Sequence, residues 1–166
     1  MTTSGIDIAI SRLVSLMTAR LWTGKSVEFN GRAYINTRDS GTLPEIFDST
    51  IGRYRDVLLD SSKSGLVFFD WQNKTGIEGQ HYTATVWIQF AVNLQTLYPT
   101  ETARADELAH QDALKWIQKS EFNPTALVTG LESFRQYTAF DGKEHDMQPF
   151  HLFRVECQVN YNYQNC

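Results

Sequence analysis

Apolar and polar residues alternate along the segment from Tyr82 to Leu97. The apolar residues stand at even positions: Tyr82, Ala84, Val86, Ile88, Phe90, Val92 and Leu94. The polar residues stand at odd positions: Thr83, Thr85, Gln89, Asn93 and Gln95. A period of two predicts a β-strand with one apolar face. At about 3.3 Å per residue the strand would reach roughly 45 Å, more than twice a typical strand, so we expect one end to project or to be covered by another chain.

A second alternating run, from Phe150 to Tyr163, closes the chain. Its apolar phase contains Phe153, Val155, Cys157, Val159, Tyr161 and Tyr163. We expect this second long strand to pair with the first, and its position in the pattern predicts that Cys157 is an inert core thiol.

Two segments have the spacing of amphipathic helices. Residues 5 to 22 place Ile6, Ile10, Leu13, Met17 and Leu21 on one face. Ser4 and Asp7 suggest a capping box, and Gly24 suggests a stop. A second helix is predicted from Glu101 to Lys119, with Thr100 as its N-cap and Asn123-Pro124 as its end.

The segments before the long strand are rich in turn residues. Asn30-Gly31 predicts a type I′ hairpin between Val27–Phe29 and Arg32–Ile35. Residues 36 to 52 read as a loop held by a few apolar residues. A second hairpin is expected between Tyr54–Leu59 and Gly65–Trp71.

Three further segments complete the expected layout. Asn73 to His81 reads as a mobile, projecting loop, because it holds two glycines and mostly polar residues. Leu131 to Phe140 has β character, and Asp141 to Pro149 reads as a charged loop. The sequence therefore predicts a single α+β domain over residues 1–166, with a mostly antiparallel sheet, two long strands, an N-terminal helix and a second helix after the first long strand.

Composition removes several classes of function. The chain has 166 residues, a formal net charge of −4 and 42% hydrophobic residues, which fits one globular domain and does not favour nucleic-acid binding. We expect neither an export signal nor a membrane span, because no apolar run is long enough. Cys157 and Cys166 are the only cysteines, so no disulfide framework or zinc cage is expected and synthesis in a reducing cytoplasm is the default.

No short motif of an enzyme, cofactor site or metal site occurs, and we predict no catalytic, cofactor or metal residue. Glu107 and His110 share a helix face, as in di-iron proteins, but such sites need a second pair and further glutamates. His81 and His151 border the long strands and read as packing residues. Asp141, Glu144, His145, Asp146 and His151 could hold a cation if their segment folded back, yet an exposed strand connection is the simpler interpretation.

Two tryptophans differ from ordinary core residues. Trp87 stands on the polar phase of the long strand, and Trp71 adjoins the polar segment that precedes it. Tryptophan is enriched at protein interfaces, so partner contact is as reasonable as packing. The predicted subunit or partner contacts are Trp71, Asn73, Lys74, Ile77, His81 and Trp87.

In the order of its elements, the chain resembles the tail-terminator and tail-completion proteins of tailed bacteriophages. The elements that carry this resemblance are the helix at 6–22, the early hairpins, the long strand at 82–97, the helix at 101–119, a strand at 131–140 and the closing strand at 150–163. It covers nearly the whole chain but includes no residue motif, so no functional residue follows from it.

The resemblance implies a structural, non-enzymatic protein of the virion tail or neck, made in the bacterial cytoplasm. Its subunits would form a ring, commonly a hexamer, on the tail tube, contacting the tail tube protein and a head-tail connector protein. Two alternatives remain open. One is a head-completion or adaptor protein, and the other is a small-ligand-binding or enzymatic α+β domain that uses Glu107, His110 and His151.

Overall fold

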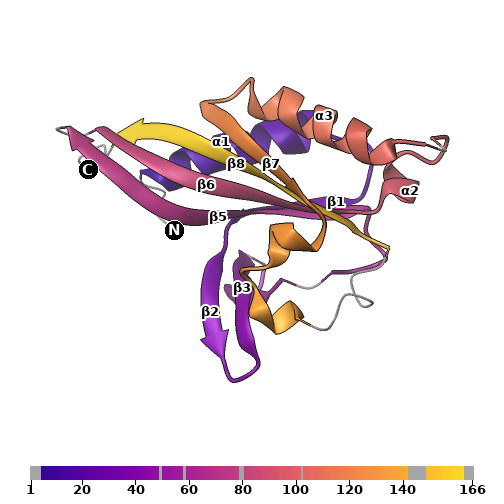
Figure 1. Ribbon diagram of the computed structural model, residues 1–166, viewed down its shortest axis with the longest axis horizontal. Helices are drawn as coiled ribbons and strands as arrows, with labels where there is room; N and C mark the ends of the chain where they lie inside the picture. Colours follow the sequence, from indigo (N-terminus) through magenta and orange to yellow (C-terminus); the bar gives the residue numbers. More distant parts are fainter. Residues whose placement is uncertain are drawn as a thin grey trace.

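Two β-sheets and two main helices form the framework of the protein (Figure 1). The computed structural model describes residues 5–48, 50–57, 59–78, 81–101, 103–141 and 149–162, and of these the side chains of residues 73–78, 81 and 162 lie outside the description. Within this part of the chain, one sheet has the strand order β1-β5-β6-β8-β7 and the other the order β2-β3-β4. The predicted single α+β fold is confirmed in class.

Three long strands form the centre of the larger sheet: β5 (Gly65–Glu78), β6 (His81–Val92) and β8 (His151–Asn162). Strand β6 is antiparallel to both neighbours, and its pairing with β8 runs unbroken from His81↔Asn162 to Val92↔His151. The predicted pairing of the two alternating runs is therefore confirmed.

The first alternating run is shorter than predicted. Strand β6 ends at Val92 because the side-chain oxygen of Asn93 accepts hydrogen bonds from the backbone N–H groups of Gln95 and Thr96. This N-cap starts the short helix α2 (Leu94–Leu97) where the period-two pattern still favoured strand.

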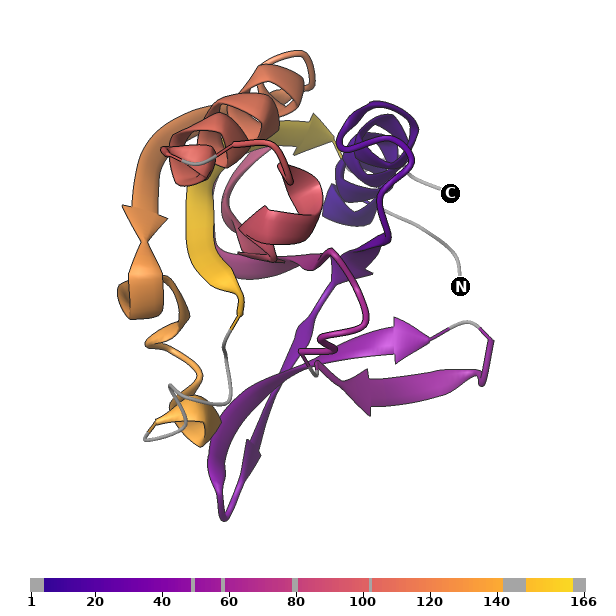
Figure 2. The ribbon, with the colours of Figure 1, turned by 90° about the vertical axis from the view of Figure 1, so that its right-hand side faces the viewer.

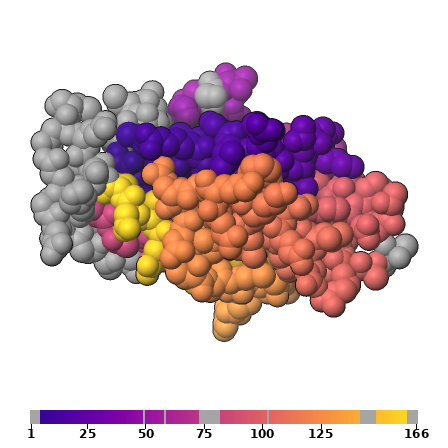
Figure 3. Space-filling view, turned by 90° about the horizontal axis from the view of Figure 1, so that it is seen from above, coloured from indigo at the N-terminus to yellow at the C-terminus, as the bar shows by residue number. Residues whose placement is uncertain are grey.

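Helices α1 (Ile6–Arg20) and α3 (Ala105–Ile117) cover one face of the larger sheet (Figures 2 and 3). The even positions of β6 point into this layer and are fully buried from Ala84 to Val92. At its centre the rings of Phe90 and Phe153 stack with centroids 4.5 Å apart. Both predicted helices are confirmed as helices that pack on the sheet.

The predicted helix starts need correction. Gly5 is the N-cap of α1 without a side-chain cap, and the carboxylate of Asp7 pairs with Arg32 instead; Ser4 lies outside the described residues. Helix α3 begins later than expected because Arg104, at φ 64°, takes a left-handed conformation and serves as its N-cap in place of Thr100.

The opposite face of the sheet is also covered. Two short 3₁₀ helices, η1 (Gly130–Phe134) and η2 (Thr138–Phe140), stand where a strand over residues 131–140 was predicted. Phe134, Tyr137 and Phe140 recur every three residues, the period of a 3₁₀ turn, and the first two pack against Phe68 of β5. This spacing explains why the β-prone composition gave helical turns.

The predicted Asn30-Gly31 hairpin is wrong. Both residues lie inside β1 (Val27–Arg32), which pairs in parallel with β5. The hairpin turn instead falls at Asp39-Ser40, between β2 (Tyr34–Arg38) and β3 (Gly41–Asp48). A parallel pair with β5 needs an extended β1, and this tertiary contact overrides the local turn preference.

Three other connections also differ from the prediction. The segment over residues 36–52 is mostly the β2-β3 hairpin and not a loop. Strand β4 (Arg53–Asp56) pairs with β3 and not with β5. The expected projecting loop from Asn73 to His81 belongs largely to strands, since β5 continues to Glu78 and β6 starts at His81.

Residues 142–148 of the predicted charged loop lie outside the described residues. The strand β7 (Phe122–Thr129) includes Pro124, which was expected only to end the preceding helix.

No helix in the described part of the chain is long and apolar enough to cross a membrane.

The corrected hairpin gives a direct test with two glycines. Gly41 has φ 111°, and an added Cβ would lie 2.8 Å from the backbone nitrogen of Ala139. Gly31 has open space around the position of a Cβ. We expect Gly41→Ala to lower the free energy of unfolding by about 1–3 kcal/mol because of strain and crowding, and Gly31→Ala to change it by less than about 1 kcal/mol. Urea denaturation of both variants measures this. A larger loss in Gly31→Ala than in Gly41→Ala would contradict the observed turn.

Candidate functional site

Among the residues that the structure describes, no strand covers the outer edge of β5 along most of its length. Strand β1 pairs with β5 only from Val27↔Gly65 to Arg32↔Phe69, and the N–H of Ala33 then donates to the carbonyl of Phe69 at 2.7 Å. Beyond this point the chain leaves for the second sheet. From Asp70 to Glu78, β6 is the only described strand that pairs with β5. Backbone groups at such an edge can accept another strand.

An aromatic groove lies where β1 departs. It has a volume of about 370 Å³ and lies between the start of β2, strand β4 and the open edge of β5. Its lining residues are Arg32, Ala33, Tyr34, Ile35, Tyr54, Asp70 and Trp71. The groove therefore adjoins Asp70 and Trp71, the first residues of β5 that no described strand pairs with on the outer side.

The aromatic side chains of the groove reach solvent. Tyr34 is 59% exposed, Tyr54 46% and Trp71 37%. The ring of Tyr54 bridges to Tyr34, with centroids 6.1 Å apart, and to Phe47, with centroids 5.5 Å apart. Aromatic residues that remain exposed in a cluster on a small sheet are typical of binding surfaces.

Arg32 links the Trp71 ring to helix α1. The guanidinium of Arg32 lies 5.3 Å from the centroid of the Trp71 ring, and its Nε lies 2.9 Å from Asp7 Oδ1. The cation-π contact and the ion pair together tie the rim of the groove to the helical layer. The carboxylate that was expected to cap α1 thus helps to orient the groove.

A buried pair of polar groups lies beneath the groove. Asp70 is only 2% exposed, and its Oδ2 accepts a hydrogen bond from the hydroxyl of Tyr137 at 2.9 Å. Burial raises the pKa of Asp70, and the hydrogen bond from Tyr137 opposes this rise only in part. The pKa of Tyr137 is also raised, by burial and by the negative charge of Asp70. The pair joins β5 to the segment between η1 and η2, which fixes the floor of the groove.

The predicted contact residues Trp71 and Trp87 do not form one surface. Trp71 lies opposite Val86, on the helical face of the sheet, whereas Trp87 lies opposite Asp70 on the other face. The guanidinium of Arg154 stands 3.8 Å from the Trp87 ring centroid and pairs with Glu156. Trp87 is therefore engaged within its own chain. The backbones of Asn73, Lys74 and Ile77 belong to the part of β5 that no described outer strand covers, whereas His81 begins β6 and is paired with both Glu78 and Asn162. The side chains of these four residues lie outside the description.

Sequence reasoning missed Arg32, Tyr34, Phe47 and Tyr54. The sequence placed Arg32 and Tyr34 in a strand of the predicted Asn30-Gly31 hairpin, Phe47 in the predicted loop over residues 36–52 and Tyr54 in a strand of the second predicted hairpin. It gave no sign that these residues share one surface. Exposed aromatic residues in a segment otherwise rich in polar and turn residues were the available signal.

His110 of α3 and His151 of β8 come together, as the ligand-binding alternative required. Their Nε2 atoms are 3.0 Å apart, and both rings contact Phe153. Burial lowers the pKa of each imidazole, and the neighbouring His151 lowers that of His110 further. Glu107 does not join them, because it pairs with Arg104 and accepts from Gln111. Among the described residues, no group of three or more His, Cys, Asp or Glu side chains could hold a metal ion.

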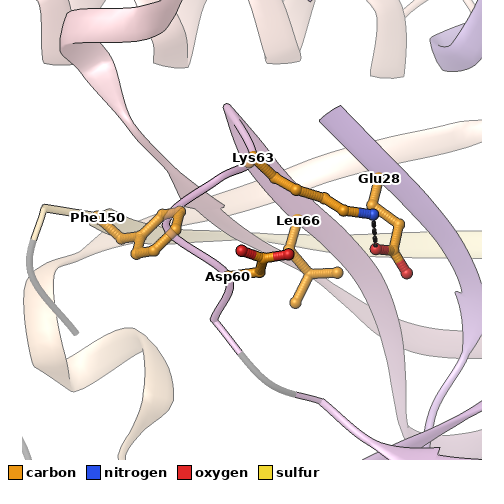
Figure 4. A pocket seen from close by; sticks show the side chains of 6 residues that line it. Glu28, Asp60, Lys63, Leu66 and Phe150 are labelled. Carbon is orange, nitrogen blue, oxygen red and sulfur yellow. Dashed lines mark hydrogen bonds and ion pairs between the residues drawn. The ribbon is translucent and has the colours of Figure 1, made fainter. Parts of the chain in front are cut away.

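A smaller cavity lies between the turn at residues 60–64 and β1 (Figure 4). Its volume of about 10 Å³ leaves room for about one water molecule. The carboxylate of Glu28 at its rim accepts from Lys63 Nζ at 2.8 Å and from Arg55 of β4. These ion pairs hold the second sheet and the turn against β1. The cavity itself is too small for a ligand.

The ion pairs of Glu28 make stability depend on pH. Burial opposes ionisation, yet the hydrogen bond from Lys63 and the charge of Arg55 outweigh it and lower the pKa of Glu28 below its usual 4.5. A lowered folded-state pKa stabilises the protein above the unfolded-state value, and this contribution is lost as pH falls through the folded-state pKa.

We expect Glu28→Gln to lower the free energy of unfolding by roughly 1–3 kcal/mol at pH 7, with the difference from the unsubstituted protein shrinking below about pH 4.5. Urea denaturation across pH measures it. The matched control is Glu132→Gln, which removes only an exposed pair with Arg135. A difference that is constant with pH would contradict the role of the Glu28 charge.

Cys157 is buried, which confirms its predicted place in the core, and burial raises the pKa of its thiol to about 12. Comparison of the sequence with protein-family models and with curated proteins finds no match.

Proposed function

We propose that the protein is a ring-forming structural subunit of a bacteriophage tail, of the tail-terminator type, and that it is not an enzyme. The observation that carries the proposal is the open edge of β5 beside the aromatic groove. The biological setting comes from the resemblance to tail-terminator proteins, of whose element order the structure keeps α1, the long strands β6 and β8, and α3.

The two edges of the larger sheet differ in a way that suits directed assembly. At one edge, β7 contains Pro124, which has no N–H to donate, and its register shifts between Pro124 and Ala126. Proline and bulges protect a strand from unwanted pairing. At the other edge, no described strand covers β5 beyond Phe69 and the exposed stretch contains no proline, although its register with β6 shifts between Trp71 and Asn73 and between Thr75 and Ile77. A surface that differs from its partner surface gives a heterologous contact, and such contacts close into rings when the rotation permits.

The open edge is long enough to support a specific interface. From Asp70 to Glu78 it spans about 30 Å at roughly 3.3 Å per residue. An extended segment from a neighbouring subunit would gain backbone hydrogen bonds along this length, and the groove would receive one of its side chains. Stable interfaces bury about 800 Å² on each partner, which a strand of this length and an aromatic anchor can supply together.

A head-completion protein, an adaptor protein and a tail terminator would all use the open edge of β5, each with a different partner. In a head-completion or adaptor protein, the open edge would bind a connector protein. In a terminator it binds a second copy and the ring then contacts the tail tube protein. We favour the second copy because the proteins that the chain resembles assemble as rings of identical subunits.

The ligand-binding alternative rests on a different observation. The groove volume of about 370 Å³ falls at the lower end of the range for small-molecule pockets. However, its exposed aromatic rings and adjoining strand edge suit an extended polypeptide better than an enclosed small molecule.

We expect Tyr54→Lys and Trp71→Lys to weaken ring formation at least tenfold, because each places a charge where an apolar side chain would be buried. The control is Gln111→Lys, on the exposed side of α3 and away from the groove. Native mass spectrometry and light scattering of each purified protein, alone and with tail tubes assembled from the tube protein, measure the subunit number and the binding.

The proposal predicts rings for the unsubstituted protein and the control, and smaller species for the two groove variants with unchanged circular dichroism. A strict monomer that never joins tail tubes would refute the proposed function. Rings that persist in both groove variants would refute the assignment of the interface.

A further inference from the structure

We propose that His110 and His151 form a two-histidine site for a divalent first-row transition-metal ion, with Cu(II) bound most tightly and Zn(II) and Ni(II) more weakly. The site joins helix α3 to the end of β8, on the helical face of the sheet. It is separate from the aromatic groove and does not depend on the proposed ring.

The distance between the two nitrogen atoms carries the argument. A metal ion bound by two imidazoles at about 2.0–2.1 Å holds the nitrogens about 2.9 Å apart at a right angle and about 3.3 Å apart at a tetrahedral angle. The Nε2 atoms of His110 and His151 are 3.0 Å apart. Helix α3 and strand β8 thus already place the two side-chain nitrogens at a spacing that chelation needs.

Packing against Phe153 holds the two imidazole rings at this spacing in the absence of a metal. Phe153, one of the largest buried side chains of the core, packs its ring 4.7 Å from the His110 ring and 5.7 Å from the His151 ring. His151 is aligned with Val92 of β6 by the sheet register, and His110 lies in the middle of α3. Ligand side chains carried on a helix and a strand lose little freedom when they bind.

The charge state favours a cation at this position. Burial lowers the pKa of both imidazoles, so the neutral form that binds metals is present at neutral pH. The carboxylate of Asp106, one helical turn before His110, attracts positive charge at both rings, and Glu107 adds to this at His110. Both histidines are only half-buried, so an ion can reach them from solvent.

Without a metal the two rings share one hydrogen bond, in which one Nε2–H donates to the other Nε2. On binding, the donor ring moves its proton to Nδ1 and both Nε2 lone pairs face the ion, so two neutral rings release no proton. Among the described residues, no third His, Cys, Asp or Glu ligand stands with them, and water would fill each position that no protein ligand takes. Two imidazoles with water suit the tetragonal geometry of Cu(II), and the ordinary affinity order places Cu(II) above Ni(II) and Zn(II).

The test uses the purified full chain with CuCl₂, NiCl₂ and ZnCl₂ in turn, by titration calorimetry and thermal unfolding. The expected result is one ion per chain and a rise in Tm with metal concentration, since the ion binds only the folded state. His110→Gln and His151→Gln should each weaken binding roughly tenfold or more, because each removes one of two chelating nitrogens. His81→Gln is the matched control, since His81 stands at the opposite end of β6 and should leave binding unchanged.

Two measurements keep the test decisive if a variant folds poorly. Circular dichroism checks each variant, and NMR of the unsubstituted protein with Zn(II) follows the histidine ring signals directly. Shifts in two coupled rings that contact Phe153 support the site. The proposal is overturned if the unsubstituted protein binds no metal, if both His110→Gln and His151→Gln bind as tightly as it does, or if Zn(II) moves only the signals of other histidines. Ring assembly measured in parallel reports on the proposed function independently.

Discussion

The central position of β6 is the constraint on which the rest of the structure depends. Its backbone is paired on both sides, with β5 and β8, so it cannot shift register without breaking two ladders. The stacked rings of Phe90 and Phe153 lock the pairing with β8 from the helical side. Because each face of the sheet near the Val92 end is buried, α1 and α3 must cover one face and the 3₁₀ helices with the second sheet must cover the other.

The departure of β1 from β5 creates most of what is distinctive about the surface. After Phe69 the main sheet loses its outer strand, and the same chain turns away to start the second sheet. The open edge, the groove and the exposed aromatic cluster are therefore three consequences of one change in direction. Glu28, Arg55 and Lys63 hold the second sheet in place with ion pairs, so the geometry of the groove depends on electrostatic contacts as well as on apolar packing.

Polar groups inside the fold are used to join distant segments. Asp70 and Tyr137 are separated by 67 positions in the sequence, and Arg154 covers Trp87 from a neighbouring strand. Burying such groups costs free energy unless they are paired, which makes each contact specific to one arrangement. His110 and His151 follow the same principle at the rim of the helical layer.

Sequence patterns alone identify the elements whose periodicity is long and regular. Period-two alternation identified β6 and β8 and their pairing, and the helical period identified α1 and most of α3, because burial of one face imposes these periods on the residues. It also identified Cys157 as a core thiol, and it selected Trp71, His110 and His151 as residues of interest. The contact role predicted for Asn73, Lys74, Ile77 and His81 remains a prediction.

The positions of the short segments depend on contacts between residues far apart in the sequence. Asn30-Gly31 has the best local turn signal in the chain, yet it is extended because β1 gains a parallel partner in β5. Phe134, Tyr137 and Phe140 have strand propensity, yet 3₁₀ turns let the first two contact Phe68 and let Phe140 contact both of them. Local preferences amount to about 1 kcal/mol or less per residue, so contacts between residues far apart in the sequence outweigh them wherever a pattern is short. The groove is formed by residues from β1, β2, β4 and β5, and no local pattern could have brought them together.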